Sequence, residues 1–331
     1  MKAQLNHLSA INTQLRPLIA VYLVFVSFTF HFFNTAKAQN PKPIRYVVIS
    51  DGDDTISVSR IVARGFMGKI AKLGHSFSFN DSFLGASELY QSLAQNRVTF
   101  EYVSGMPEIL NDILPGSFTR FLANNEFPGE PSGVHVRSAV DGDTKTYKIA
   151  TIKRIIERNT RNEPNTEFVY ILVGDNGEKD IEVYKEISRF VAENMNPAQS
   201  KIGATFIHKL YTGAPALDLL PGQRPFYTFA DFAIQVQALF PELITEGNVS
   251  KVVNLVTEAL KSTELSLDSV RNLALPSWAE LTDSDLENFH RIVQSSRLLT
   301  DDLKAELSNL VSMRAAHRSF QPRALRCAHV F

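Results

Sequence analysis

Four short apolar segments most constrain how this chain of 331 residues can fold. Each is four to six residues long and rich in β-branched and aromatic side chains, and together they cover residues 46–49, 98–103, 168–173 and 204–207. Continuous apolar runs of this length are typical of strands that are buried on both faces of a sheet. The sequence therefore predicts at least four strands in the core.

Helical patterns separate the later segments. Within residues 149–158, Ile152, Ile155 and Ile156 fall on one helical face, and a second helix is expected over 182–194. Strands that alternate with helices form parallel sheets covered by helices on both faces. We therefore predict an α/β fold with a doubly wound parallel sheet.

The pattern changes after residue 213, where Gly and Pro interrupt the chain at 213–215 and 221–222. Helical spacing then extends over 229–314, with start signals at 266–268 and 282–285 and a boundary at Pro276. We expect an α/β domain over 39–215, a helical C-terminal region over 216–316 and a tail over 317–331. The tail contains arginines and no acid, so it suits peripheral contact with anionic lipid, but a solvated terminus is the favoured interpretation.

The N-terminus has the features of a secretory signal peptide. The first fifty residues contain no Asp or Glu, residues 18–33 are almost wholly apolar, and Ala36-Lys37-Ala38 fits the small-residue cleavage rule. We predict cleavage after Ala38 and export to the periplasm or the exterior. An uncleaved membrane anchor is the alternative, although the apolar stretch is shorter than the roughly twenty residues that a spanning helix needs.

Charge and cysteine content exclude several classes of protein. Lys and Arg total 34 against 35 Asp and Glu, so no net positive field would attract nucleic acid. The single cysteine, Cys327, permits neither an intrachain disulfide nor a cysteine-built zinc site. The eight histidines form no zinc-hydrolase pair.

Acidic residues follow the first and third apolar segments. The first segment leads into Asp51-Gly-Asp53-Asp54-Thr55, and the third leads into an acidic stretch from Asp175 to Asp180. In open α/β sheets, loops at the carboxyl ends of strands form the binding crevice, and clustered carboxylates there suit a hard cation such as Mg²⁺. An EF-hand is excluded, because its sixth and twelfth positions would be Ile56 and Val62 rather than Gly and Glu.

Groups that suit phosphate oxygens accompany the acids. Ser104 and Gly105 end the second segment, and Lys148 is expected at the start of the helix between the second and third segments. A hydroxyl, an ammonium group and nearby backbone amides can hold an anionic oxygen. Together these motifs suit a divalent cation such as Mg²⁺ and phosphate oxygens.

The order of these motifs resembles the haloacid dehalogenase superfamily of phosphohydrolases. Its pattern is D-x-D-x-T, then Ser or Thr after a strand, then Lys, then G-D-x-x-x-x-D. Five segments look like the phosphatidate phosphatase catalytic-domain family, which is found in yeast actin-patch lipid phosphatases and many bacterial proteins. These segments are VVISDGDDTIS, FEYVSGMPEIL, YKIATIKRII, FVYILVGDNGEKDIEVY and ATFIHKL. The resemblance covers about residues 44–212. Family members often have Ile where this chain has Gly52, and Ser where it has Asn176.

The resemblance implies a role for each site residue. Asp51 would be the nucleophile and Asp53 the general acid and base, with Thr55 orienting their loop and Asp54 structural. Mg²⁺ would be held by Asp51, the backbone carbonyl of Asp53, and Asp175. Asp180 would either bind the metal directly or contact one of its ligands. The phosphoryl oxygens would be held by Ser104, Gly105 and Lys148.

The implied reaction converts phosphatidate to diacylglycerol and phosphate. Two alternatives stay open from the sequence: an exported phosphatase acting on small soluble phosphomonoesters, and a non-catalytic binding protein on a phosphatase fold. The aromatic-rich stretch 56–97 is equally consistent with receiving an acyl chain and with ordinary core packing.

Overall fold

The computed structural model describes residues 42–58, 82–107, 117–138, 142–212, 217–261, 274–276 and 279–319. The proposed signal peptide, most of the aromatic-rich stretch, the start signal at 266–268 and the end of the tail lie outside these residues. The chain divides into Met1–Lys42 and Pro43–Phe331, and the fold below is that of the second unit. Among its described helices, none combines the length and apolarity needed to cross a bilayer.

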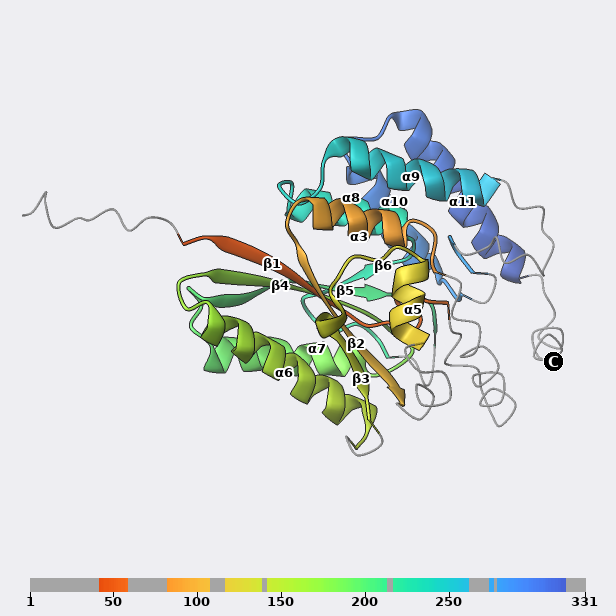
Figure 1. The fold of residues 1–331 in the computed structure, drawn as a ribbon. Helices are drawn as coiled ribbons and strands as arrows, with labels where there is room; N and C mark the ends of the chain where they lie inside the picture. Colours follow the sequence, from red (N-terminus) through yellow and green to blue (C-terminus); the bar gives the residue numbers. More distant parts are fainter. Residues whose placement is uncertain are drawn as a thin grey trace, which may run out of the picture. The chain divides into compact units, whose positions relative to one another are not determined.

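A six-stranded parallel sheet forms the centre of this unit (Figure 1). Its strands are β1 (Ile44–Ser50), β2 (Thr99–Pro107), β3 (Val134–Arg137), β4 (Glu167–Asp175), β5 (Ser200–His208) and β6 (Gln223–Phe226), in the order β3-β2-β1-β4-β5-β6. The predicted parallel α/β fold is confirmed. The chain builds outward from β1 to β3 and then returns to place β4 beside β1, so these two central strands form the switch point of the sheet.

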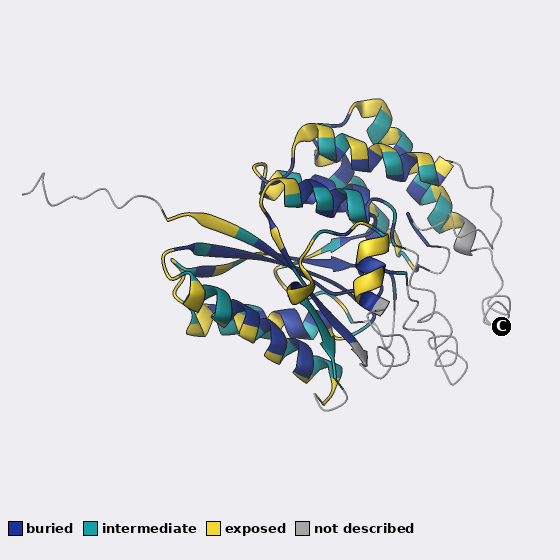
Figure 2. Ribbon diagram, viewed as in Figure 1, coloured by how far each residue is buried: buried dark blue, intermediate teal, exposed yellow. Residues whose placement is uncertain are grey.

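Helices cover both faces of the sheet. The short helices α5 (Ser117–Asn124) and η1 (Pro131–Gly133) come between β2 and β3 in the chain. One face carries α6 (Thr144–Asn162) and α7 (Asp180–Asn194); the other carries α3 (Ala86–Gln95), α8 (Phe229–Leu239) and α9 (Glu246–Lys261), over which α10 (Asp283–Ser295) and α11 (Asp301–Ser319) pack. Figure 2 shows that the strands are mostly buried, whereas the helices are buried only on their inner sides. Alternation along β1 divides the two cores, because Val48 faces one and Val47 and Ile49 face the other.

Helix starts follow local capping chemistry. The predicted start at 282–285 is confirmed, since Thr282 and Asp285 form a reciprocal capping box at α10. The helix expected over 149–158 is longer than predicted. The carboxylate of Asp143 accepts hydrogen bonds from the amides of Lys145 and Thr146, so α6 begins at Thr144 and Lys148 lies in its second turn rather than at its start.

The helical C-terminal region is confirmed, and it shares a core with the sheet. Strand β6 lies beyond residue 215, where we placed the domain boundary. Side chains of β4 and β5, such as Ile171 and Phe206, belong to the same buried cluster as Phe232 of α8 and Val253 of α9. The ring centroids of Phe206 and Phe232 are 4.8 Å apart. The described helices after β6 therefore complete one face of the sheet.

We expect Val253→Ala to destabilise the whole folded unit. The substitution removes two methyl groups from a fully buried position and should lower the free energy of unfolding by about 2 kcal/mol. Because the core is shared, calorimetry should show one unfolding transition shifted to lower temperature. Met313→Ala, at an exposed position of α11, is the matched control and should leave the transition unchanged. Two separate transitions, with only one shifted by Val253→Ala, would contradict a shared core.

Candidate active site

The predicted acidic motifs meet at the carboxyl edge of the two central strands. Asp51 directly follows β1 and Asp175 ends β4, and the amide of Asp51 donates to the carbonyl of Val173 at 2.9 Å. Ser104 lies on β2, the neighbour of β1 on its other side. The switch point of the sheet thus brings together residues that are more than a hundred positions apart in the sequence.

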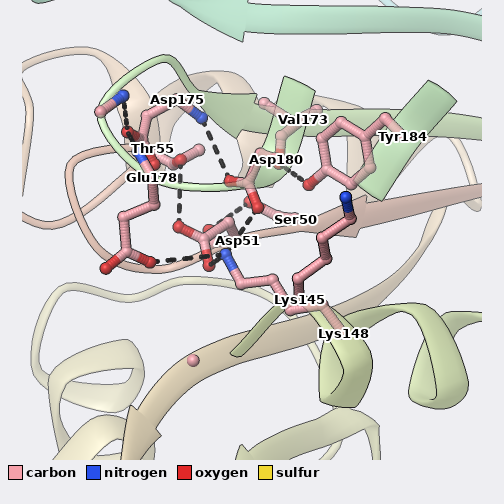
Figure 3. A network of polar contacts seen from close by, with 12 residues as sticks. Ser50, Asp51, Thr55, Lys145, Lys148, Val173, Asp175, Glu178, Asp180 and Tyr184 are labelled. Atoms are coloured by element: carbon pink, nitrogen blue, oxygen red, sulfur yellow. Dashed lines mark hydrogen bonds and ion pairs between the residues drawn. The ribbon is translucent and has the colours of Figure 1, made fainter. Parts of the chain in front are cut away.

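Lys148 joins the two acidic loops. Its Nζ lies 2.6 Å from Oδ1 of Asp51 and 2.6 Å from Oδ1 of Asp180, and all three side chains are at most 1% exposed (Figure 3). Burial alone would lower the pKa of Lys148, but the carboxylates of Asp180 and Asp51 outweigh it and raise the pKa well above its usual value. The lysine is therefore held charged.

Asp175 presents one oxygen to the protein and one to the site. Its Oδ1 accepts hydrogen bonds from the amides of Gly177 at 2.5 Å and Glu178 at 3.2 Å, whereas its buried Oδ2 accepts none. Asp180 reaches back to the same loop, since its Oδ2 accepts from the amide of Asp175 at 3.3 Å. One carboxylate oxygen from each of Asp51, Asp175 and Asp180 lies within 4.8 Å of the others, a spacing that suits a shared cation.

The site carries more negative than positive charge. Glu178, to which the sequence analysis gave no role, places its Oε2 3.9 Å from Nζ of Lys148. Burial raises the pKa of Asp51, Asp175 and Asp180; repulsion from Asp180 raises it further at Asp51 and Asp175, whereas Lys148 partly offsets the effect of burial at Asp180. One lysine does not balance four carboxylates, so a divalent cation would stabilise their ionised forms. The buried oxygen donors therefore fit a hard metal ion.

A tight turn carries Asp53 and Thr55. The amides of Ile56 and Ser57 both donate to the carbonyl of Gly52, at 3.1 and 3.0 Å, and this closes the turn directly after Asp51. Asp53 and Thr55 are buried within it. The hydroxyl of Thr55 donates to Oδ2 of Asp51 over a long 3.4 Å, which agrees with the predicted role of orienting the loop but does not test it.

Gly105, the residue after Ser104, lies beside the first two turns of α6. A Cβ atom on Gly105 would clash with Cγ2 of Thr144 and would lie 3.5 Å from Cε of Lys148, so the close approach of β2 and α6 requires glycine here. Arg137, at the end of β3, donates through Nε to the carbonyl of Gly105 at 3.1 Å. The structure thus places both predicted phosphate-binding elements, Ser104–Gly105 and Lys148, next to one another.

His208 supports these loops from the end of β5, a role that the sequence analysis did not assign although the residue lies within the quoted segment ATFIHKL. His208 is fully buried, and its Nδ1 lies 3.0 Å from the carbonyl oxygen of Asp54. Its ring stacks on Phe226, with centroids 4.6 Å apart, and meets Phe83 edge-on at the same distance. A lone histidine more than 150 positions from Asp54 gives no sequence signal for this contact.

We expect His208 to make stability depend on pH. Burial lowers the pKa of His208 to about 4, from the 6.5 of a free imidazole. Between those values the unfolded chain binds the proton that the folded chain excludes, so stability is fully present above pH 6.5 and is lost as the pH falls towards 4. From pH 7 to pH 5 the loss should be about 2 kcal/mol.

The measurement is the free energy of unfolding against pH, compared with His208→Asn. Asparagine keeps an amide donor near the position of Nδ1 but does not titrate. The variant should therefore lose about 2 kcal/mol less than the original chain over this range. Equal pH slopes for the two proteins would show that His208 titrates normally.

Gly52 departs from the isoleucine common in the family, and the structure gives a reason. A Cβ on Gly52 would lie 2.6 Å from Cε2 of Phe118, whose buried ring stacks on Phe121 with centroids 6.1 Å apart. We expect Gly52→Ile to destabilise the fold by about 1–3 kcal/mol through overpacking. In chemical unfolding of the double variant, Gly52→Ile should partly compensate for the loss of stability that Phe118→Ala causes. Strictly additive losses would show that the two side chains do not compete for this space.

Comparison with known proteins follows this geometry. Residues 46–197 match the family model described as phosphatidate phosphatase APP1, catalytic domain. This match confirms the family resemblance inferred from the motifs, and it includes Asp51, Ser104, Lys148, Asp175 and Asp180. Comparison with curated proteins gave no match. Residues 46–197 thus form a domain similar to the phosphatidate phosphatase catalytic domain, and this match supports a phosphatase enzyme.

Proposed function

We propose that this chain is a Mg²⁺-dependent phosphatase that hydrolyses a phosphate monoester through a phosphorylated Asp51. The observation that carries the proposal is the buried cluster of Asp51, Lys148, Asp175 and Asp180 within the matched catalytic domain. This cluster combines an anionic nucleophile with the fixed positive charge of Lys148 and with an acidic site for a second cation. These are the components that phosphoryl transfer to a carboxylate needs.

The metal would be held by oxygen ligands alone. Asp51 and Asp175 would bind it directly together with the backbone carbonyl of Asp53, and Asp180 would be a ligand or would orient one. The unpartnered Oδ2 of Asp175 supports this assignment, because a buried carboxylate oxygen without a hydrogen bond is costly unless it meets a cation. Bound Mg²⁺ would offset the repulsion between the anionic nucleophile and the anionic phosphate.

The chain's own residues would carry the two chemical steps. A carboxylate oxygen of Asp51 attacks phosphorus, the bond to the ester oxygen breaks, and Asp53 gives a proton to the departing alcohol. Asp53 then takes a proton from water, whose oxygen attacks the phosphorus and releases inorganic phosphate, so that Asp51 is regenerated. Lys148, Ser104 and the amide of Gly105 would hold the phosphoryl oxygens throughout.

Phosphatidate is the substrate that the family match favours, giving diacylglycerol and phosphate. The alternative is a soluble phosphomonoester, since the same catalytic scaffold can serve different substrates. Export through the predicted signal peptide, and peripheral membrane contact to reach a lipid substrate, belong to this proposal. A purely binding role is disfavoured by the complete set of predicted catalytic side chains at one site.

Phosphate release by the full chain tests the proposal. We expect release with Mg²⁺, none with EDTA, and a loss of about a thousandfold or more in Asp51→Asn, because the nucleophile is removed. Asp218→Asn, at an exposed carboxylate outside the cluster, is the matched control and should retain full activity. Comparing phosphatidate in detergent micelles with glycerol phosphate separates a lipid enzyme from a soluble-ester phosphatase. Activity that survives in Asp51→Asn would exclude the nucleophile assignment.

A further inference from the structure

We propose that Tyr211 is a positioning residue for the acid–base group Asp53, and that the C-terminal helical region acts on the active site through it. This inference rests on the proposed function, because it concerns the step in which Asp53 gives a proton to the departing alcohol. Tyr211 lies outside the matched catalytic domain and in none of the motifs that identify the family.

The residue next to Asp53 has an unusual backbone conformation. Asp54 has a φ of 54°, in the left-handed region that costs a residue other than glycine about 1 kcal/mol. Such a conformation persists only where surrounding contacts fix it. Asp54 is also 1% exposed, so its carboxylate needs partners within the protein.

Contacts from two sides provide that restraint. The hydroxyl of Tyr211 donates to Oδ2 of Asp54 at 2.5 Å. Nδ1 of His208 lies 3.0 Å from the carbonyl oxygen of Asp54. The amide of Asp54 donates to the carbonyl of Ser57 at 2.8 Å. The amide, the carbonyl and the side chain of Asp54 are therefore all held, and the backbone of Asp53 is fixed from its C-terminal side.

Tyr211 is itself fixed to the second acidic loop. Asn176, the residue after Asp175, accepts hydrogen bonds from the amides of Leu210 and Tyr211 through Oδ1, at 2.9 and 3.1 Å. Its Nδ2 donates to the carbonyl of Tyr211 at 2.7 Å. The backbone of Tyr211 is thus tied to the loop of Asp175 while its side chain reaches the loop of Asp53.

The helical region holds the same segment from the other side. Glu280 accepts from the hydroxyl of Thr212 at 2.6 Å, and its own amide donates to the carbonyl of Leu210 at 2.7 Å. Lys209 pairs with Asp285 of the α10 capping box at 2.6 Å. Every residue from 209 to 212 is therefore bonded either to an acidic loop or to residues at or just before the start of α10.

The catalytic consequence follows from how strongly proton transfer depends on geometry. A positioned general acid accelerates a reaction about 10²–10⁴-fold, and a displacement of about 1 Å can remove much of this acceleration. Loss of the Tyr211 hydroxyl would leave Asp54, and with it the adjacent Asp53, less firmly placed. The loss should appear only where the leaving group needs a proton.

Leaving-group dependence in Tyr211→Phe tests the inference with the full chain and Mg²⁺. We expect kcat/KM for glycerol phosphate, whose alkoxide must be protonated, to fall about tenfold. For p-nitrophenyl phosphate, whose phenolate departs without a proton, it should fall less than about twofold. Tyr46→Phe is the matched control, since it removes a hydroxyl bonded to Glu242 at the opposite edge of the sheet, and should change neither value.

Two further variants test the contacts at Asp54 and at Glu280. In an Asp54→Gly background, where glycine accepts the left-handed conformation, Tyr211→Phe should cause no further loss. Glu280→Ala should reproduce the selective loss on glycerol phosphate in weaker form, because it loosens the segment without touching Tyr211.

Each outcome decides the inference. Equal losses on both esters would show a merely structural role and would overturn it, as would no loss in Tyr211→Phe. In either case the proposed function stands if the original chain releases phosphate and Asp51→Asn does not. An original chain that releases phosphate from none of glycerol phosphate, p-nitrophenyl phosphate and phosphatidate would overturn the inference and the proposed function together.

Discussion

The buried ion pairs of Lys148 are the interaction on which the site depends. A charge removed from water costs several kcal/mol, and here one ammonium group faces carboxylates from two different strand ends. Lys148 is buried because it occupies the apolar stripe of α6, four, seven and eight positions before Ile152, Ile155 and Ile156. The hydrophobic packing that docks α6 on the sheet thus also brings the lysine to the acids.

That same geometry places the loops of Asp51 and Asp175 side by side. In a parallel sheet, strands that are adjacent in space end at the same edge, and the return of the chain from β3 to β4 leaves β1 and β4 as neighbours. The carboxylates of Asp51 and Asp175 are then forced together, and each gains a raised pKa from burial and repulsion. Repulsion that would destabilise an ordinary loop is what makes this edge of the sheet fit a cation.

The sequence predicted those parts of the molecule that local patterns encode. β1, β2, β4 and β5 each contain one of the predicted apolar segments. In contrast, β3 and β6 are four-residue edge strands in which polar or half-buried side chains predominate, and β6 contains Pro225. The acids of each motif could be recognised because they are close together in the chain. The contacts of His208 and Tyr211 with Asp54 join positions more than 150 apart, and only the tertiary fold shows them. Helical periodicity after residue 229 predicted helices but could not show which surface they cover.

The family match ends at residue 197, whereas the folded unit continues through the helical region. This difference indicates what the helical region contributes to the site. Residues 46–197 include the first four strands but end before β5, which pairs with the whole length of β4 and supplies His208. Without β5, the strand that carries Asp175 would be an edge strand paired with β1 alone, and the turn at Asp54 would lose its support from His208. The face of β5 that meets α8 is in turn packed against described helices that follow β6. The acidic site is therefore built from residues 46–197 but held in shape by the chain that comes after them.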